Sequence, residues 1–492
     1  LLGAIDLGTT STRFSLFARN GASVASKSQA IKQIYPSHGW HEQNPNEYLT
    51  ATLSCIDQVM QQADAKRGEV ACIGITNQRE TTVVWDKETG EPLHNAIIWD
   101  DTRTHKYCET LQDHAPKMAE ITGLVVNPYF SASKMRWLID HVPAVKAAVN
   151  NRTARFGTAE SWLVYKLTKE KKHLTDISNA SRTLLMSLDG KWDASQIETF
   201  GIPALSLPEI THNTANFGSF NSGLLEGVPI TGCIGDQFAS TIGHLCIEPG
   251  SCKNTYGTGS FLLLNTGNQL VKSRHGLLTT VIGQFGPSQP ITYGLEGSVE
   301  AAGSCLNWFT RELGIVKRVE ELEDLANSVP DAGDVFFVPA LSGLYAPHWD
   351  ATARGCILGL TQHTTKAHIA RAVLEGICYR TAEGIHAIGQ DYGSNVKTLS
   401  VDGGLTANAF LMKTQAALSS CRIRKPEVPE LTCLGAALTA GIGAGVYDSL
   451  HDVKKSVELS ESFIDSPIDA RKRNEMWSRW HKAVERAKHW AQ

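Results

Sequence analysis

The sequence predicts an α/β protein made of two duplicated domains that face each other across a cleft. Short apolar runs typical of buried strands alternate with helical patterns along the whole chain. Two similar strand–turn–strand segments, rich in Gly and Thr, open the two halves and form a weak internal repeat. The length of 492 residues is enough for two separate cores.

Composition narrows the functional classes. The chain is 42% hydrophobic and 20% charged with a net charge of −4, and it has no block of basic residues with interleaved aromatics. We therefore expect no nucleic-acid partner, and no apolar run is long enough for a transmembrane segment. The 11 cysteines are scattered without a C-x-x-C pair, which favours reduced thiols and a cytoplasmic protein, although an organelle is not excluded.

The opening hairpin carries the first candidate site. An apolar strand ends at Asp6, Gly8 allows a close backbone approach, and Thr9, Thr10 and Ser11 offer hydroxyl and N–H donors. The alternating segment 13–17 predicts the returning strand. These donors suit phosphate oxygens, and Asp6 suits a hydrated Mg²⁺ beside them. An ordinary hairpin tip is an equally good interpretation of this stretch alone.

The next elements lead to a polar pair. A third strand is expected near 23–32, then a helix over 44–65 with Asn44 as its cap, then a buried strand over 70–76. Arg79 and Glu80 follow that strand. Arg donates in a planar fork and ionised Glu only accepts, so the pair is suited to the hydroxyls of a polyol. The alternative is a surface ion pair.

The remainder of the first half supplies an aromatic residue and a carboxylate. Segments 82–85 and 96–99 predict a hairpin-like unit whose Trp99 is a candidate apolar wall or a core residue. A helix is expected within 129–138, further apolar structure over 156–167, and a loop over 179–183. The buried strand 228–235 ends at Asp236 and Gln237, where Asp236 is a candidate catalytic base. A helix cap is the alternative for Asp236.

We place the domain boundary where the turn Ile247-Glu248-Pro249-Gly250 begins, which gives residues 1–246 and residues 247–492 as the two domains. The second domain opens with the turn Gly257-Thr258-Gly259 between strand-like runs. Two such turns, one from each domain, are suited to close on one nucleotide. Strands are expected over 291–296, 335–338 and 398–401, and helices over 298–313, 366–389, from 406, over 433–444 and around 477–487.

Several long motifs match a known family. The matching segments, in chain order, are 77–82, 129–138, 254–259, 343–347, 355–360 and 368–375. In these motifs the chain resembles the FGGY carbohydrate kinases, a family within the actin-like (ribonuclease H-like) ATPase superfamily. It resembles in particular the members of this family that act on glycerol. The resemblance covers nearly the whole chain. It implies two duplicated actin-like ATPase domains, phosphoryl transfer from ATP to glycerol to give sn-glycerol 3-phosphate, a Mg²⁺ cofactor, and a homo-oligomer such as a dimer or tetramer.

The resemblance also implies residue roles. Glycerol would contact Arg79, Glu80, Tyr129, Asp236, Gln237, Trp99 and Phe261, with Asp236 as the general base. The nucleotide would contact Thr9, Thr10, Ser11, Arg13, Thr258, Gly303, Asn307, Gly404 and Asn408. Asp6 would organise Mg²⁺ through water. Taken without the resemblance, the strand–Asp-Gly-Gly turn at 402–404 suits a nucleoside but is also an ordinary tight turn.

Some positions depart from the family pattern, namely Leu7, Glu160, Ser161, Asn307 and His348. Leu7 and Asn307 could change nucleotide affinity. None of these departures removes a residue assigned to glycerol or to the base. No histidine loop or sugar-bisphosphate site is recognisable, so regulation is left open.

Three alternatives remain at this point. A family member could act on a longer sugar or sugar acid, which a substrate panel would reveal. A chaperone-like or filament-forming ATPase would hydrolyse ATP without glycerol. A catalytically inactive relative is disfavoured, because Asp6, Asp236 and both Gly-Thr turns are intact.

Overall fold

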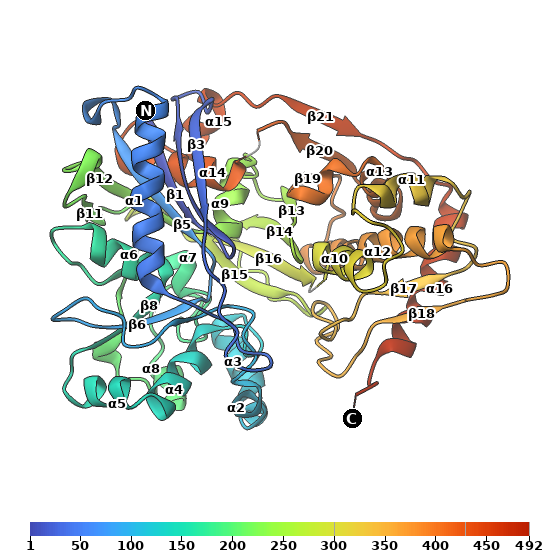
Figure 1. Cartoon of the computed structure of the whole chain (residues 1–492), viewed down its shortest axis with the longest axis horizontal. Coiled ribbons are helices and arrows are strands. Elements are labelled where there is room, and N and C mark those ends of the chain that lie inside the picture. Colours follow the sequence, from blue (N-terminus) through green and yellow to red (C-terminus); the bar gives the residue numbers. More distant parts are fainter. Residues whose placement is uncertain (300, 429, 492) are drawn as a thin grey trace.

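The computed structural model describes residues 1–299, 301–428 and 430–491. It contains two lobes, each built on one mixed β-sheet, with the N-terminus on the first lobe and the C-terminus at the lower end of the second (Figure 1). The predicted α/β class with a duplicated core is confirmed. The similarity of the two lobes is clearest in the order of their strands.

The first sheet has six strands. In spatial order they are β11 (Gly218–Ser219), β12 (Pro229–Gly235), β5 (Cys72–Asn77), β1 (Leu2–Leu7), β2 (Ser11–Phe17) and β3 (Ser23–Ala30). The strand β1 pairs with β2 in an antiparallel hairpin and with β5 in parallel, and β12 runs parallel to β5. The three central strands therefore end at the same edge of the sheet.

The second sheet has seven strands. In spatial order they are β15 (Leu278–Gly283), β16 (Thr292–Val299), β14 (Ser260–Gly267), β13 (Cys252–Tyr256), β19 (Thr398–Asp402), β20 (Arg422–Pro426) and β21 (Glu461–Ile464). Its core repeats the first sheet, because β16-β14-β13-β19-β20 has the strand directions of β3-β2-β1-β5-β12. The predicted internal repeat is thus a repeat of topology.

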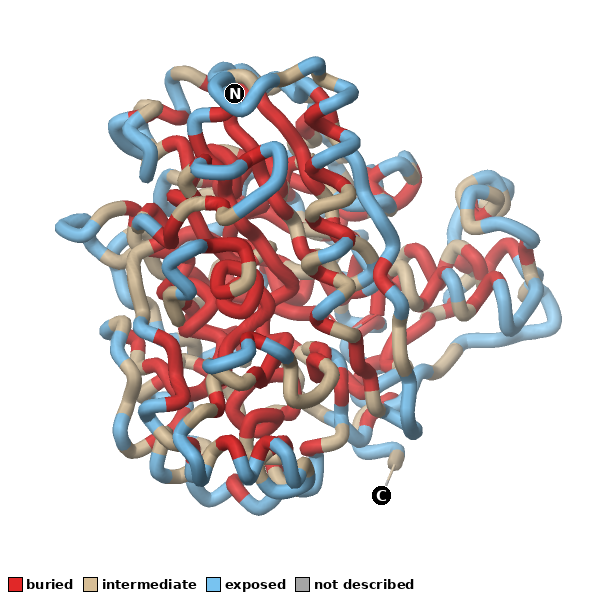
Figure 2. Tube along the Cα trace, turned by 60° about the vertical axis from the view of Figure 1, so that its left-hand side comes forward, coloured by how far each residue is buried: buried red, intermediate tan, exposed pale blue. Residues whose placement is uncertain are grey.

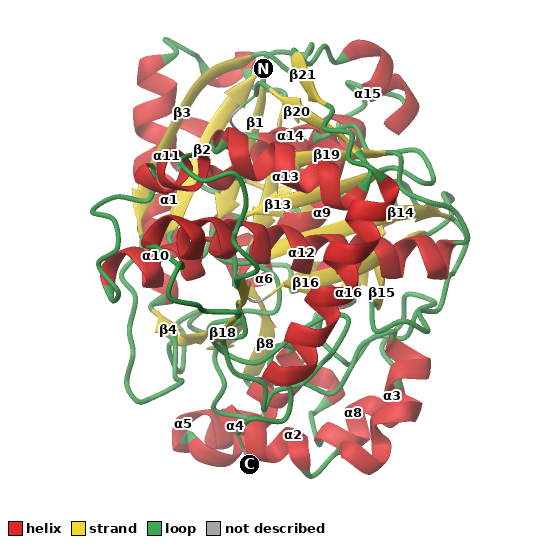
Figure 3. Cartoon of the chain, turned by 90° about the vertical axis from the view of Figure 1, so that its right-hand side faces the viewer, coloured by secondary structure: helices red, strands yellow, loops and turns green. Residues whose placement is uncertain are grey.

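Helices form three layers around the two sheets. The outer face of the first sheet is covered by α1 (Pro45–Gln62) and α6 (Ala159–Leu167). The layer between the sheets consists of α9 (Asp236–Gly243) and α14 (Leu431–Gly443). The outer face of the second sheet is covered by α12 (Lys366–Tyr392), which crosses the sheet in Figure 3, and by α13 (Ala409–Ser419). On the same side lie α11 (Glu321–Asn327), which packs on both of these helices, α10 (Gly303–Arg311) and α16 (Ala470–Ala487).

The remaining elements lie around this framework. A second, four-stranded sheet of the first lobe contains β4 (Glu42–Gln43), β7 (Ala96–Ile97), β6 (Thr82–Asp86) and β8 (Ala154–Thr158). It packs with α2 (His105–Glu109), α3 (Ala115–Thr122), α4 (Ser131–His141), α5 (Pro143–Asn150) and α8 (Ala194–Phe200). Smaller pieces are β9 (Leu174–Asp176), β10 (Glu209–Thr211), α7 (Ile177–Ala180), β17 (Phe336–Val338), β18 (Cys356–Leu358) and α15 (Leu450–Ser456). The 3-10 helices are η1 (Arg67–Glu69), η2 (Gln112–His114), η3 (Ala204–Ser206), η4 (Gly223–Leu225) and η5 (Gly404–Ala407).

Alternation along the strands explains the layers. Ile5 and Leu7 of β1 join the core beneath α1, whereas Leu2 and Ala4 join the core that contains α9 and α14. Both faces of this strand are therefore buried, as its apolar sequence predicts. Figure 2 shows buried residues running through the interior strands and exposed residues at the loops. None of the helices in the described ranges is long and apolar enough to cross a membrane.

Some predicted elements differ in extent. The helix expected over 298–313 begins only at Gly303, because β16 continues through Val299. The expected loop over 179–183 includes the end of α7, which Asp176 caps by accepting from the backbone of Ser178 and Asn179.

The contact between α9 and α14 depends on glycine. A Cβ on Gly435 would overlap the carbonyl oxygen of Ala239, and a Cβ on Gly243 would overlap that of Leu431. We expect Gly435→Ala to lower the free energy of unfolding by about 2 kcal/mol, because the two helices cannot separate without disturbing both sheets. Urea denaturation measures this loss. The control is Gly68→Ala, since a Cβ there meets no atom within 4 Å; an equal loss in both variants would contradict the prediction.

Candidate active site

The site lies where the parallel strands of the first sheet end. Asp6 at the end of β1 is opposite Thr76 of β5, and Gly235 at the end of β12 is opposite Asn77. This register brings Asp6, the residues after β5 and the residues after β12 to one edge. In α/β sheets, ligands bind outside the carboxyl ends of the strands.

A cavity of about 150 Å³ opens at this edge. Both lobes line it, through Thr9, Arg79, Glu80, Trp99, Tyr129, Asp236, Gln237, Thr255, Gly257, Thr258 and Phe261. All seven residues predicted to contact the polyol are in this lining, together with one predicted nucleotide residue from each Gly-Thr turn. Thr255 was not predicted as a site residue, and Gly257 was predicted only as part of the second turn. The volume is below the roughly 300 Å³ at which pockets for larger ligands begin, so the cavity suits a molecule of few atoms.

Three aromatic rings form one wall of the cavity. Trp99 meets Tyr129 edge-to-face with ring centroids 5.6 Å apart, and it meets Phe261 of the second lobe at 5.9 Å. The indole Nε1 of Trp99 donates to Thr9 Oγ1 at 3.0 Å. The wall is thus fixed to the tip of the first hairpin and provides apolar surface for the carbon side of a ligand.

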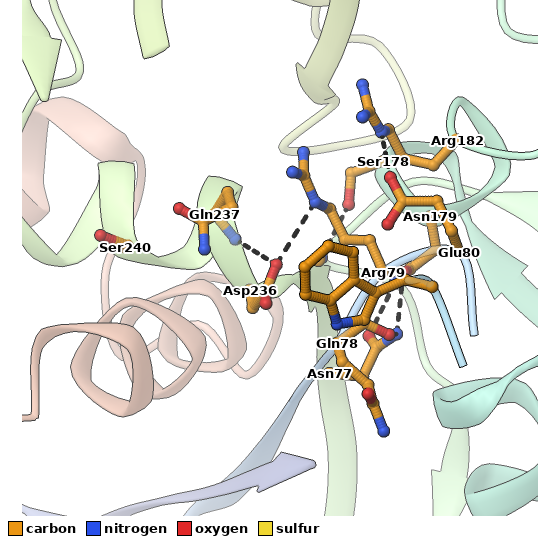
Figure 4. Close-up of polar contacts among 12 residues, drawn as sticks. Asn77, Gln78, Arg79, Glu80, Ser178, Asn179, Arg182, Asp236, Gln237 and Ser240 are labelled. Atoms are coloured by element: carbon orange, nitrogen blue, oxygen red, sulfur yellow. Dashed lines mark hydrogen bonds and ion pairs between the residues drawn. The ribbon is translucent and has the colours of Figure 1, made fainter. Parts of the chain in front are cut away.

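Asp236 is the first residue of α9, directly after β12 (Figure 4). Its Oδ1 accepts from the backbone N–H of Gln237 at 2.7 Å and lies 3.3 Å from Arg79 Nε. Burial raises the pKa of this carboxyl, and Arg79 opposes the rise without cancelling it. The carboxyl also lines the cavity, with 27% of its side chain exposed. The Asp236 carboxyl therefore lies at the start of a helix and is accessible to a ligand. Its raised proton affinity suits a general base.

Arg79 and Glu80 are buried and each has a partner elsewhere, which excludes a surface ion pair between them. Arg79 Nη1 and Nη2 donate to the two carboxylate oxygens of Glu296 at 2.8 Å each. Glu80 Oε1 accepts from Arg182 Nε at 2.6 Å, and Arg182 Nη2 lies 3.3 Å from Glu296 Oε1. The four side chains form a continuous buried charge cluster, to which the second lobe contributes Glu296.

The cluster explains the ionisation of Glu296. Burial opposes its negative charge, but Arg182 and Arg79 outweigh that effect and lower its pKa to about 2. Neither Glu296 nor Arg182 was predicted from the sequence as a site residue. The signal for Glu296 was a carboxylate inside the apolar strand Leu295-Glu296-Gly297, since ionised side chains are buried only with partners.

The backbone around Glu80 is held in an unusual conformation. Glu80 has a φ of 62°, in the left-handed region that side chains rarely adopt. Its carbonyl accepts from Ser131 Oγ at 2.9 Å and from Thr82 Oγ1 at 3.1 Å. The buried Lys134 donates to the carbonyl of Tyr129 at 2.7 Å. These contacts fix the two loops that carry polyol candidates.

Asp6, at the start of the first hairpin turn, is buried close enough to Asp236 to feel its charge. Burial and the neighbouring Asp236 raise the pKa of Asp6 to about 7, while Arg13 opposes the rise. Arg13 is opposite Asp6 on β2 and forms an ion pair with Glu430. No three His, Cys, Asp or Glu side chains gather as a metal site within the described ranges. A pair of carboxylates short of positive charge fits a Mg²⁺ that completes its shell with phosphate and water.

Four of the predicted nucleotide residues belong to the second lobe and lie outside the lining of the cavity. Gly303 at the start of α10 donates its N–H to the carbonyl of Gly257 in the second turn at 2.9 Å. Gly404 begins η5, beyond the end of β19. Asn408 caps α13, because its side-chain oxygen accepts from the N–H of Leu411 at 2.8 Å. Asn307 is exposed on α10.

The family departures have structural partners. Leu7 is fully buried in the core beneath α1. Glu160 accepts from Thr158 Oγ1 at 2.7 Å and from Thr175 Oγ1 at 2.8 Å. His348 lies 3.2 Å from Glu383. None of these three side chains lines the cavity.

A larger hollow of about 430 Å³ lies elsewhere, between the turn after α9 and the starts of β13 and β19. This hollow is more open than the 150 Å³ cavity, and its lining includes no predicted site residue and no carboxylate. Because the perturbed acids and the aromatic wall surround the smaller cavity, we place the site there.

Two family models match the chain. The model of the N-terminal domain of the FGGY family of carbohydrate kinases matches residues 1–243, and the model of the C-terminal domain of that family matches residues 252–444. Curated relatives extend the match over the full length. The chain is 43% identical to glycerol kinase 2 of Streptomyces avermitilis, covering 99% of this chain and 97% of the relative. It is also 43% identical to a glycerol kinase of Symbiobacterium thermophilum, with 99% and 98% covered.

Solved structures give the same result. The crystal structure of Plasmodium falciparum glycerol kinase with ADP superposes with a TM-score of 0.91 at 37% identity, covering 99% of this chain and 98% of that one. A gluconate kinase from Lactobacillus acidophilus superposes with a TM-score of 0.86 at 23% identity, covering 98% and 97%. At that lower identity the likeness concerns the fold alone.

Proposed function

Because this chain belongs to the FGGY family of carbohydrate kinases, we propose that the cavity between its lobes is the polyol site of the enzyme. The protein is a kinase that transfers the γ-phosphoryl group of ATP to glycerol and forms sn-glycerol 3-phosphate. The observation that supports this site best is that all seven polyol candidates, from separate segments of both lobes, line one small cavity. The ADP in the Plasmodium structure supports the nucleotide assignment.

Recognition of glycerol follows from the donors and acceptors around the cavity. Arg79 and Gln237 supply donors, and Glu80 and Asp236 supply carboxylate acceptors. The hydroxyls of a triol can pair with both kinds of group, while Trp99 covers the carbon side. Leaving one such buried group unpaired costs roughly 1–3 kcal/mol, so shorter or differently arranged alcohols are disfavoured.

Asp236 acts as the general base in this proposal. Its carboxylate takes the proton of the attacking hydroxyl as the oxygen bonds to the γ-phosphorus and the bond to the ADP oxygen breaks. Arg79 Nε stabilises the ionised form before transfer. Phosphoryl transfer asks for little covalent chemistry from the protein, so positioning and charge stabilisation provide most of the rate.

The nucleotide phosphates lie between the two Gly-Thr turns in this proposal. Thr9, Thr10 and Ser11 of the first turn and Thr258 of the second provide hydroxyl and N–H donors. Arg13 supplies positive charge on the first side. The adenosine then extends along the rim of Gly303, Asn307, Gly404 and Asn408.

We propose Asp6 as the residue that holds Mg²⁺, through water, with Asp236 nearby. The fit rests on the two close carboxylates and the raised pKa of Asp6. When bound, Mg²⁺ neutralises charge on the phosphates during transfer. Asp6 would hold the hydrated cation at the edge of the first hairpin.

Two further proposals concern the protein in the cell. We propose a cytoplasmic location, which the eleven scattered cysteines support, ten of them buried. We also propose a homo-oligomer, a dimer or tetramer. Light scattering coupled to size-exclusion chromatography measures its mass in solution.

ADP release on adding glycerol tests the function directly. We expect release with glycerol and ATP, and little with xylulose, gluconate or other longer sugars at equal concentration. Equal rates with the longer sugars would favour the broader sugar-kinase alternative. ADP release that does not depend on any polyol would favour an ATPase with another role.

Arg79→Ala tests the polyol site. We expect the KM for glycerol to rise about 10- to 100-fold, because a charged hydrogen bond of roughly 1.5–3 kcal/mol is lost. The KM for ATP should change by less than about twofold, since Arg79 lines the cavity that we propose for the polyol. Initial rates at saturating co-substrate give both values. Equal increases in the two constants would show that Arg79 does not bind the polyol.

A further inference from the structure

A lysine with no role in the mechanism above is buried beside the cavity. Lys253 is the second residue of β13 in the second lobe, and its side chain is fully buried. Its Nζ donates to Gln237 Oε1 of the first lobe at 2.5 Å and to Thr255 Oγ1 at 2.8 Å. Gln237 and Thr255 both line the cavity. Lys253 therefore lies directly behind two lining residues, one from each lobe.

The chemistry of the contact fixes the amide of Gln237. An ammonium group can only donate, so the atom that faces it must be the amide oxygen. The –NH₂ of the same amide then points away from Lys253. Among the described residues, Nε2 of Gln237 has no hydrogen-bond partner and is not among the fully buried polar atoms left unpaired. It is the free donor that Gln237 presents on the ligand side.

The charges around Lys253 support this arrangement. Burial is the largest effect and lowers the pKa of Lys253, while Asp402, Asp236 and Glu296 favour its ammonium form and Arg79 opposes it. Carboxylates from both lobes thus favour the charged form of Lys253. A side chain without a hydrogen-bond donor at this position would leave the amide oxygen of Gln237 unpaired and without a fixed direction.

We propose that Lys253 is a positioning residue for glycerol recognition, which fixes Gln237 so that Nε2, and not Oε1, faces a glycerol hydroxyl oxygen. The inference rests on the proposed polyol site and deepens it. It also makes recognition depend on the relative placement of the lobes, since Lys253 and Gln237 come from different ones. The pocket then offers donors at Arg79 and Gln237 and acceptors at Glu80 and Asp236, which matches a ligand with several hydroxyl groups.

A double-mutant cycle tests the proposal. Lys253→Met keeps the length of the side chain and removes its donor. We expect the KM for glycerol to rise about tenfold, which corresponds to about 1.4 kcal/mol, with the KM for ATP within about twofold. In the Gln237→Ala background the same Lys253→Met change should raise the KM for glycerol by no more than about twofold, because its effect passes through the amide. A structural role would raise the KM equally in both backgrounds, and that result would overturn the proposal.

A second variant does not depend on the folding of Lys253→Met. Gln237→Glu keeps the contact with Lys253 as an ion pair but replaces the free donor by an acceptor. We expect the KM for glycerol to rise at least tenfold while the affinity for ADP, measured by calorimetric titration, stays unchanged. Unchanged glycerol binding in Gln237→Glu would overturn the proposal. Failure of the proposed function itself would look different, since the unmodified enzyme would then release no ADP with glycerol.

Discussion

Asp236→Asn is expected to lower kcat by about 10³-fold, within the range for loss of a general acid or base. The amide keeps the size of the carboxyl and its contact with the backbone of Gln237, but it cannot accept the proton of the attacking hydroxyl. ADP affinity should change little, because the carboxyl lines the cavity that we propose for the polyol. A coupled ADP-release assay gives kcat, and calorimetric titration with ADP gives the affinity.

The control for this variant is Asp140→Asn, at an exposed ion pair on α4 with Arg136. It makes the same chemical change far from the cavity and should leave kcat within about twofold. If Asp236→Asn retained more than a tenth of the turnover, Asp236 would not be the base.

Much of the site could be predicted because its residues follow strands. Arg79, Glu80 and Asp236 come directly after apolar runs, and parallel strands bring their carboxyl ends to one edge. The two Gly-Thr turns could also be recognised in the sequence, because each joins two strands of an antiparallel hairpin. The family motifs then supplied roles that the residues alone left open.

The residues that were missed depend on contacts between the lobes. Glu296, Arg182 and Lys253 lie in separate segments, and nothing in a single sequence shows which of them meet in space. The carboxylate of Glu296 inside an apolar strand indicated a buried charge, but the sequence did not show which residues it would contact. The start of α10 was also missed, because β16 continues as a paired strand through Val299 where the sequence pattern suggested a helix.

Glu296→Ala is expected to lower the free energy of unfolding by about 3–5 kcal/mol. The change leaves Arg79 and Arg182 buried, close together and without the carboxylate that both contact. Glu80 and Asp236 then balance only part of the positive charge of the two guanidinium groups. Their repulsion should also move the lobes apart, so the KM for glycerol should rise as well. Urea denaturation without ligands measures the stability, and initial rates measure the KM.

Burial, rather than the ion pair as such, is what makes this effect large. The control Glu91→Ala removes an ion pair of similar length, 2.9 Å to Lys166, but Glu91 is 59% exposed, so we expect a loss below about 1 kcal/mol.

The pH dependence of stability separates the effect of the Glu296 charge from the effect of its packing. The pKa of Glu296 is lowered from 4.5 to about 2 in the fold. The contribution of its charge to the free energy of unfolding is therefore complete above pH 4.5 and is lost as the pH falls towards 2. The difference in the free energy of unfolding between the unmodified enzyme and Glu296→Ala should shrink between pH 4.5 and pH 2. A difference that stayed constant between pH 4.5 and 2 would mean that Glu296 contributes by filling space, and the charge cluster would not hold the two lobes together.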